Sequence, residues 1–113
     1  MERKTNQVYL LHIRDAVDLI LSWSVGKNID DFKTDIKLQS AIVRQIEIIG
    51  EAVRNISSEL KINFPDIPWR PISDTRNRLM HEYFSVDLEK VWRIVTQDIP
   101  NLKKQILKIL QTL

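Results

Sequence analysis

Cysteine is absent from the sequence, which excludes disulfides and thiolate metal sites and fits a reducing compartment. Glycine occurs twice and proline four times, so few positions can interrupt a helix. No apolar run is long enough to cross a bilayer, and the first residues, Met1 to Lys4, lack the apolar core of a signal peptide. We therefore expect a cytoplasmic protein with no membrane partner.

The composition is that of a small globular domain. Of the 113 residues, 43% are hydrophobic and 28% are charged, and this length predicts a single domain spanning residues 1–113. The net charge of +2 and pI of about 9.0 are too weakly basic to indicate nucleic-acid binding by themselves. No segment alternates between apolar and polar residues as an amphipathic strand does, so we predict an all-α protein.

Apolar residues at helical spacing predict a bundle of four helices with a possible fifth segment. The first helix is expected over about 6–25, ending before Gly26. A polar connection carries one apolar residue, Phe32, which we expect to pack into the core. It leads to a second helix that is capped by Thr34 or Asp35 and extends to about Lys61.

The second half of the chain begins with a proline-rich break over 63–71, whose apolar residues predict an ordered, packed loop. A third helix is expected over about 72–84, with Pro71 in its first turn. A fourth helix follows a turn in which Ser85 or Asp87 can act as cap, and its apolar stripe continues across Pro100. There the helix either kinks or restarts with Asp98 as the cap.

Several features of the first two helices have ordinary explanations. Gly50 lies inside the apolar stripe of the second helix, where it favours the close approach of a neighbouring helix. Glu47 and Glu51 flank it on one face, and we expect them to be solvated rather than to bind a metal. His12 has no second histidine or carboxylate at ligand spacing, and we expect a surface or boundary position.

The densest group of reactive side chains is Arg76-Asn77-Arg78-Leu79-Met80-His81-Glu82-Tyr83. Cations that hold phosphate and an imidazole that moves protons near neutral pH are the parts of phosphodiester chemistry. On an ideal helix Asn77 and His81 share a face, and Asn77 can orient the imidazole. Arg76 and His81 are about 140° apart, so only the long arginine side chain or a distorted turn lets both reach one phosphate.

This octapeptide resembles the Arg-x4-His-x-Tyr signature of the HepT-like toxins of the HEPN (higher eukaryote and prokaryote nucleotide-binding) superfamily. The resemblance covers nearly the whole chain. The segment 46–57 is similar to that family's Ile-Gly-Glu-Ala helix, 67–92 is similar to its Pro-Trp loop, motif helix and Val-Asp turn, and 99–102 fits as well.

The resemblance implies a homodimeric all-α RNase toxin whose site forms where the motif helices of two subunits meet. Arg76 and His81 would be catalytic, Arg76 and Arg78 would bind RNA phosphate, and Asn77 would have a supporting role. The nucleophile would be the ribose 2′-OH, so we expect no metal, no cofactor, a 2′,3′-cyclic phosphate product and no cleavage of DNA.

The resemblance also implies a regulatory partner. HepT-like toxins of type VII toxin–antitoxin systems pair with a small MntA-type nucleotidyltransferase, which transfers AMP from ATP onto the motif tyrosine, here Tyr83. A bound AMP next to Arg76 and His81 would occupy the RNA phosphate site and neutralise its cations. The alternative for Tyr83 is simple packing.

Two other functions compete with the toxin. A non-catalytic helical module could act as the binding partner of a nucleotidyltransferase, although such a scaffold has no need for the Arg76 and His81 pair. A free-standing nucleic-acid-binding protein ranks last, because the sequence has no dense basic patch with interleaved aromatic residues.

Overall fold

The computed structural model describes residues 2–81 and 86–113, without the side chains of 2–4, 77, 80 and 81. Within this part of the chain every regular element is a helix, as the sequence predicts. In order along the chain, these are α1 (Glu2–Ser24), α2 (Ile29–Lys33), α3 (Ile36–Asn55), α4 (Ser58–Asn63), α5 (Trp69–His81), α6 (Leu88–Arg93), the π-helix η1 (Ile94–Asp98) and α7 (Ile99–Thr112).

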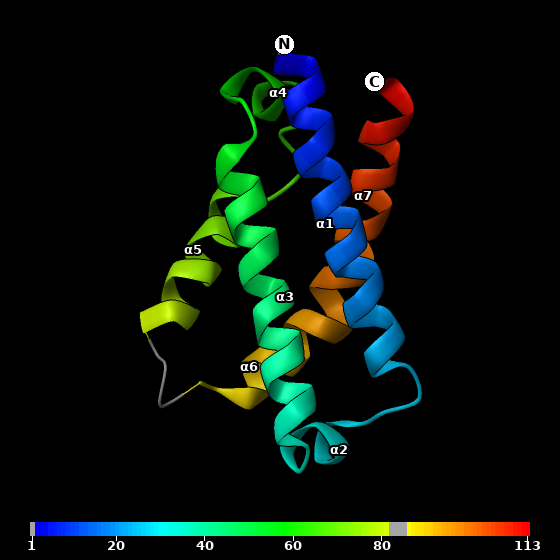
Figure 1. The fold of residues 1–113 in the computed structure, drawn as a ribbon, viewed down its shortest axis with the longest axis vertical. Coiled ribbons are helices and arrows are strands. Elements are labelled where there is room, and N and C mark those ends of the chain that lie inside the picture. The colour runs from blue at the N-terminus through cyan, green and yellow to red at the C-terminus, as the bar shows by residue number, and fades with distance from the viewer. Residues whose placement is uncertain (1, 82–85) are drawn as a thin grey trace.

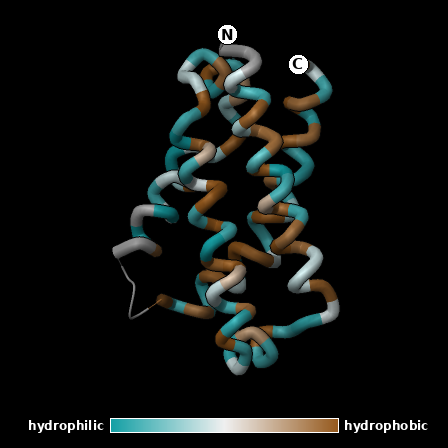
Figure 2. The backbone as a smooth tube through the Cα atoms, in the orientation of Figure 1, coloured by the Kyte–Doolittle hydropathy of each residue, from teal (hydrophilic) through white to brown (hydrophobic). Residues whose placement is uncertain are grey.

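The long helices α1, α3 and α7 run side by side and enclose the core, and α5 lies along the outer side of α3 (Figure 1). Apolar residues are concentrated on the facing sides of these helices (Figure 2). The fully buried side chains come from these three helices and from α2, α6 and η1, and include Leu10, Ile13, Val17, Ile20, Phe32, Ile42, Val53, Val91, Val95, Ile106 and Ile109.

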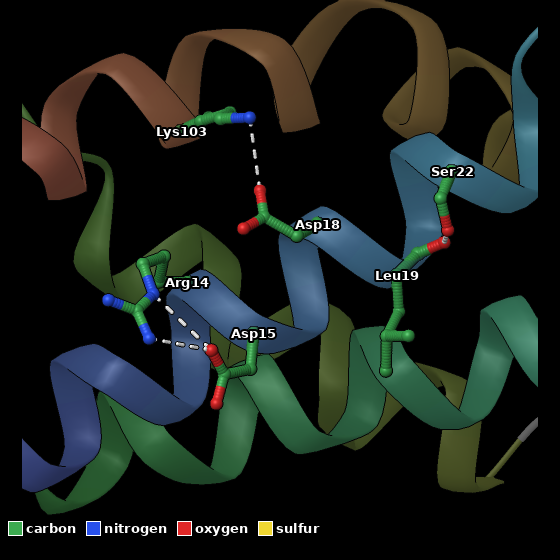
Figure 3. A network of polar contacts seen from close by, with 6 residues as sticks. All are labelled: Arg14, Asp15, Asp18, Leu19, Ser22 and Lys103. Atoms are coloured by element: carbon green, nitrogen blue, oxygen red, sulfur yellow. Dashed lines mark hydrogen bonds and ion pairs between the residues drawn. The ribbon is translucent and has the colours of Figure 1, made fainter.

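Polar contacts join the bundle at its surface. Lys103 Nζ of α7 forms an ion pair with Asp18 of α1 at 3.1 Å (Figure 3). Arg14 and Asp15 form a second ion pair on the adjacent turn of α1 (Figure 3). No helix in the described segments combines the length and apolarity that a membrane span requires.

The polar connection after α1 contains a helix that the sequence analysis did not predict. Gly26 has a φ of 73°, which suits glycine and ends α1. Asn28 then caps α2 through a reciprocal capping box with Asp31. This short helix buries Phe32 completely, and its ring stacks on Trp92 of α6 at 5.1 Å between centroids. The predicted role of Phe32 in the core is confirmed.

The predicted second helix is wrong at its C-terminus, because the structure divides it into α3 and α4. Asp35 caps α3 as expected, accepting from the Leu38 N–H. Ile56 has extended backbone (ψ 142°), and Ser57 caps α4. The cause is a tertiary contact: Asn6 of α1, which is buried, accepts from the Ser57 N–H and donates to its hydroxyl, both at 2.9 Å.

The last predicted helix is also divided. Asp87 caps α6 by accepting from the Glu89 and Lys90 N–H groups, as one of the predicted options. Asp98 makes no side-chain cap. Instead the chain widens into the π-helix η1, where the Ile99 N–H reaches the Ile94 carbonyl. Pro100 explains the widening, because it has no N–H to donate to Thr96 in an α-helical ladder.

Candidate active site on helix α5

The proline-rich loop determines where α5 begins. Trp69 is buried, and its indole N–H donates to the Phe64 carbonyl at 3.0 Å. Ile67 is also buried, which confirms the predicted packed loop. Helix α5 starts at Trp69, three residues before the expected start, so that Pro71 lies in the first turn, where its missing N–H costs nothing.

Arg76 lies at a close approach between α5 and α3. A Cβ added to Gly50 would overlap the Cβ of Arg76 and crowd its Cγ and Cδ. Gly50 itself is buried. The predicted reason for this glycine, close approach of a neighbouring helix, is therefore confirmed, and the residue that approaches is the first arginine of the motif.

Glu51 fixes the other end of the same side chain. Its Oε2 lies 3.0 Å from Nη2 of Arg76, and the arginine side chain is 19% exposed. The neighbouring carboxylate, Glu47, pairs with Arg44 at 3.6 Å. Glu51 is exposed, as expected of a solvated carboxylate, and it also holds a motif residue through an ion pair between two helices, which the sequence did not predict.

Arg78 lies on a different side of α5 from Arg76. The two residues are about 160° apart around the helix, and Arg78 is exposed and lines a hollow formed with α6 and η1. The two arginines predicted to bind phosphate are therefore not brought together within one subunit. Leu79, next to Arg78, is buried and anchors this part of α5 to the core.

The remaining motif residues are described only in part. Asn77 and His81 belong to α5, and His81 is its last residue. The Cα of His81 lies about 140° around the helix from that of Arg76 and about 60° from that of Arg78. Tyr83, the predicted site of AMP transfer, lies outside the described residues, between α5 and Val86.

Sequence reasoning missed the partnership between Glu51 and Arg76. Its signal was present, because a glycine that predicts close approach of a helix is followed directly by a carboxylate. Which helix approaches, and which cation it brings, depends on tertiary packing. His12, which the sequence placed at a surface or boundary, is exposed and touches Tyr9 edge-on.

Comparison with known proteins identifies the family of this chain. Residues 13–109 match the family described as Ribonuclease HepT-like. A probable ribonuclease HepT from Thermococcus cleftensis is 39% identical over 107 residues, which cover 95% of this chain and 97% of that protein. No solved structure matches significantly.

Another similar protein, from Methanocaldococcus jannaschii, is named gamma-glutamylcyclotransferase and putative RNase. It is 43% identical over 111 residues, covering 98% of this chain. The chain spans half the length of that relative.

The helical fold and the match to the family model define an all-α protein of the HEPN superfamily. Within that class, the chain belongs to the HepT-like ribonuclease family. The predicted enzyme class, a ribonuclease, is confirmed at the level of the family.

Proposed function

We propose that this protein is an endoribonuclease toxin that cuts RNA with Arg76 and His81 and acts in a type VII toxin–antitoxin system. Membership in a ribonuclease family supports RNA as the substrate. The observation that carries the catalytic assignment is the position of Arg76, which Gly50 admits against α3 and Glu51 holds through its guanidinium. A solvated surface arginine has no need of either.

The chemistry that these residues suit is transesterification within RNA. The ribose 2′-OH attacks the adjacent phosphorus, the bond from phosphorus to O5′ breaks, and a 2′,3′-cyclic phosphate forms. His81 removes the 2′-OH proton or supplies a proton to the leaving O5′. Arg76 stabilises the charge that develops on the non-bridging oxygens. This scheme needs no metal because the nucleophile is part of the substrate.

Glu51 acts in this scheme as a positioning residue. A guanidinium has five N–H donors in a fixed plane, so Arg76 can hold Glu51 and a phosphate together. The ion pair limits the rotamers of a long side chain before RNA arrives, which reduces the entropy lost on binding. Asn77 would support His81 from the same face of α5.

A homodimer built through α5 would complete the site. One observation supports it: α5 packs mainly on α3, and its exposed side chains, among those described, include Arg70, Pro71, Asp74 and Arg78. A second copy would add another set of Arg76, Arg78 and His81 and bring more cations to the RNA. Light scattering coupled to gel filtration measures this state directly.

Control of the toxin would fall to an MntA-type nucleotidyltransferase. The Tyr83 hydroxyl would attack the α-phosphorus of ATP, the bond to the β-phosphate would break, and pyrophosphate would leave. The attached phosphate would compete with RNA for Arg76 and His81. Incubation with the transferase and ATP should add the mass of AMP to the protein, and Tyr83→Phe should prevent it.

The competing function is a non-catalytic helical partner of a nucleotidyltransferase. The ion pair of Arg76 with Glu51 favours it in one respect, because a paired, mostly buried arginine is also a common structural element. The two functions differ in whether the protein alone cuts RNA.

The decisive experiment is cleavage of a labelled RNA in EDTA, using protein produced without the transferase. We expect a cyclic phosphate product from the natural chain and none from His81→Ala. Intact mass must show no adduct on Tyr83. If the unmodified protein is silent on a broad panel of RNAs, the nuclease proposal fails and the binding-partner function replaces it.

A further inference from the structure

The side of α5 that carries Arg78 borders a continuous furrow whose opposite wall is α6, η1 and the start of α7. The furrow consists of two hollows of about 300 and 330 Å³, and Thr75, Ile94 and Asp98 line both of them. The two hollows differ in chemistry: one is cationic and the other is apolar.

The cationic hollow is lined by Arg78, Lys90 and Arg93, all of which are exposed. Within residues 2–81 and 86–113, no carboxylate lies within ion-pair distance of any of these three side chains. Of the two carboxylates among the described residues that line this hollow, Asp87 is engaged as the cap of α6. Asp98 is the second carboxylate. The cationic side chains of this lining therefore outnumber the carboxylates, and the α6 end of the furrow favours an anionic ligand.

The apolar hollow continues from this end toward the proline-rich loop. Its walls are mainly aliphatic, with Ile49 of α3, Ile72 of α5 and Leu102 of α7 among them, and exposed Asn101 provides an amide at its edge. Sites for small ligands have this composition and size, in which apolar walls bury a flat group and a few polar groups orient it.

The π-helix η1 lies at the junction of the two hollows. Its wide turn brings Ile94 and Asp98 to the furrow together, since both line each hollow. Single π-turns are uncommon and are found preferentially at functional sites, because their irregular ladder costs stability. Pro100 produces the turn here, next to the furrow.

The furrow also lies on the side of α5 that is nearer to His81. Around α5, the Cα of His81 is about 60° from that of Arg78 but about 140° from that of Arg76. A strand that passes His81 on this side therefore continues along the Arg78 side of the helix.

We propose that this furrow binds the RNA nucleotide next to the cleaved phosphodiester. Its phosphates lie against Arg78, Lys90 and Arg93, and its base enters the apolar hollow. This inference rests on the proposed ribonuclease function for the identity of the strand.

The test measures RNA binding separately from cleavage, by fluorescence anisotropy with a short labelled RNA and His81→Ala protein. Lys90→Gln with Arg93→Gln in that background should weaken binding. Each phosphate contact on a single strand contributes about 0.7 to the slope of log affinity against log salt, so the slope should fall by about 1.4. Between about 50 and 200 mM salt, the parent should then lose about sevenfold more affinity than the variant.

The matched control is Lys27→Gln with Lys37→Gln. Both lysines are exposed and lie outside the furrow, on the connection before α2 and in the first turn of α3. This variant removes the same charge and should keep the parental slope. An oligomer of ribose phosphate without bases should bind the parent more weakly than RNA, with an unchanged slope, because only the apolar hollow loses its ligand.

Equal slopes for the two double variants would overturn the phosphate assignment, and equal affinity for the abasic oligomer would overturn the base assignment. A change of oligomeric state in the furrow variant alone would make the furrow an interface between copies and also overturn the proposal. If the natural chain cuts RNA while the furrow variant binds RNA normally, the furrow proposal fails and the nuclease proposal stands. If the slope falls but the natural chain never cuts, the nuclease proposal fails, and the furrow remains an RNA-binding site that is not next to a cleaved phosphodiester.

Discussion

The two sides of α5 carry arginines in opposite situations. Arg76 is inserted between α5 and α3, with its guanidinium paired to Glu51 and its exposure limited to 19%. Arg78 is exposed over an open furrow. A held arginine loses little entropy when it meets a transition state, whereas a mobile one suits the tracking of a flexible backbone. The comparison predicts that the first arginine affects kcat and the second affects KM.

The largest expected effect comes from removing the held arginine. Arg76→Ala should lower kcat for RNA cleavage by about 10²–10³-fold, the usual effect of losing one preorganised donor to the transition state. Arg78→Ala should mainly raise KM, because it removes a phosphate contact that substrate and transition state share. Steady-state kinetics on one labelled RNA measures both, and a dominant kcat effect at Arg78 would reverse the assignment.

The next effect concerns the packing that admits Arg76. Gly50→Ala should destabilise the fold by about 1–3 kcal/mol, the usual cost of overpacking, because the new Cβ overlaps that of Arg76. Chemical denaturation measures this change. In an Arg76→Gly background the overlap is gone, so the same substitution should instead stabilise the helix by up to about 1 kcal/mol.

The change of sign in that double-mutant cycle is specific to the contact between these two residues. If Gly50→Ala lowers the free energy of unfolding equally in both backgrounds, the glycine is not required for the contact with Arg76.

A smaller effect is expected at Glu51. Glu51→Gln keeps the shape but removes the charge that holds Arg76, and kcat should fall about tenfold, the result of a mispositioned catalytic group. Glu47→Gln is the matched control, since Glu47 pairs with Arg44 on the same helix. An equal loss of kcat in both variants would indicate a general charge effect rather than positioning.

The smallest effect is expected at the exposed ion pair that joins α2 to α6, the helix that forms part of the furrow wall. Lys33 of α2 donates to Glu89 of α6 at 2.9 Å, and this hydrogen bond, with the charge of Glu89, raises the pKa of Lys33 above 10.5. A raised folded-state pKa means that the contribution to stability is complete below pH 10.5 and is lost as pH rises through the folded value.

Lys33→Met should therefore lower the melting temperature slightly at neutral pH, and the difference should shrink in strong alkali. Lys27→Met, which breaks no ion pair in the described part of the chain, is the control. A pH-independent difference would show that Lys33 contributes through packing instead.

Much of the fold was predictable because it depends on local periodicity. The apolar stripes predicted the long helices, Gly26 predicted the end of α1, and Asp35 and Asp87 were each one of two residues predicted as caps. The errors occur where a contact with a residue far away in the sequence determines where a helix ends. Asn6 bonds to Ser57, fifty-one residues away, just beyond the end of α3, and no local pattern contains that contact.

The sequence by itself determined an all-α protein, the packed proline-rich loop and the identity of the motif, because helix period, proline and residue type are local properties. Tertiary structure alone decided that Arg76 meets Gly50 and Glu51 while Arg78 faces the furrow. The spacing in sequence tells how far apart two side chains lie around a helix. Which of them meets a neighbouring helix depends on how the helices pack, and that arrangement is set by the whole core.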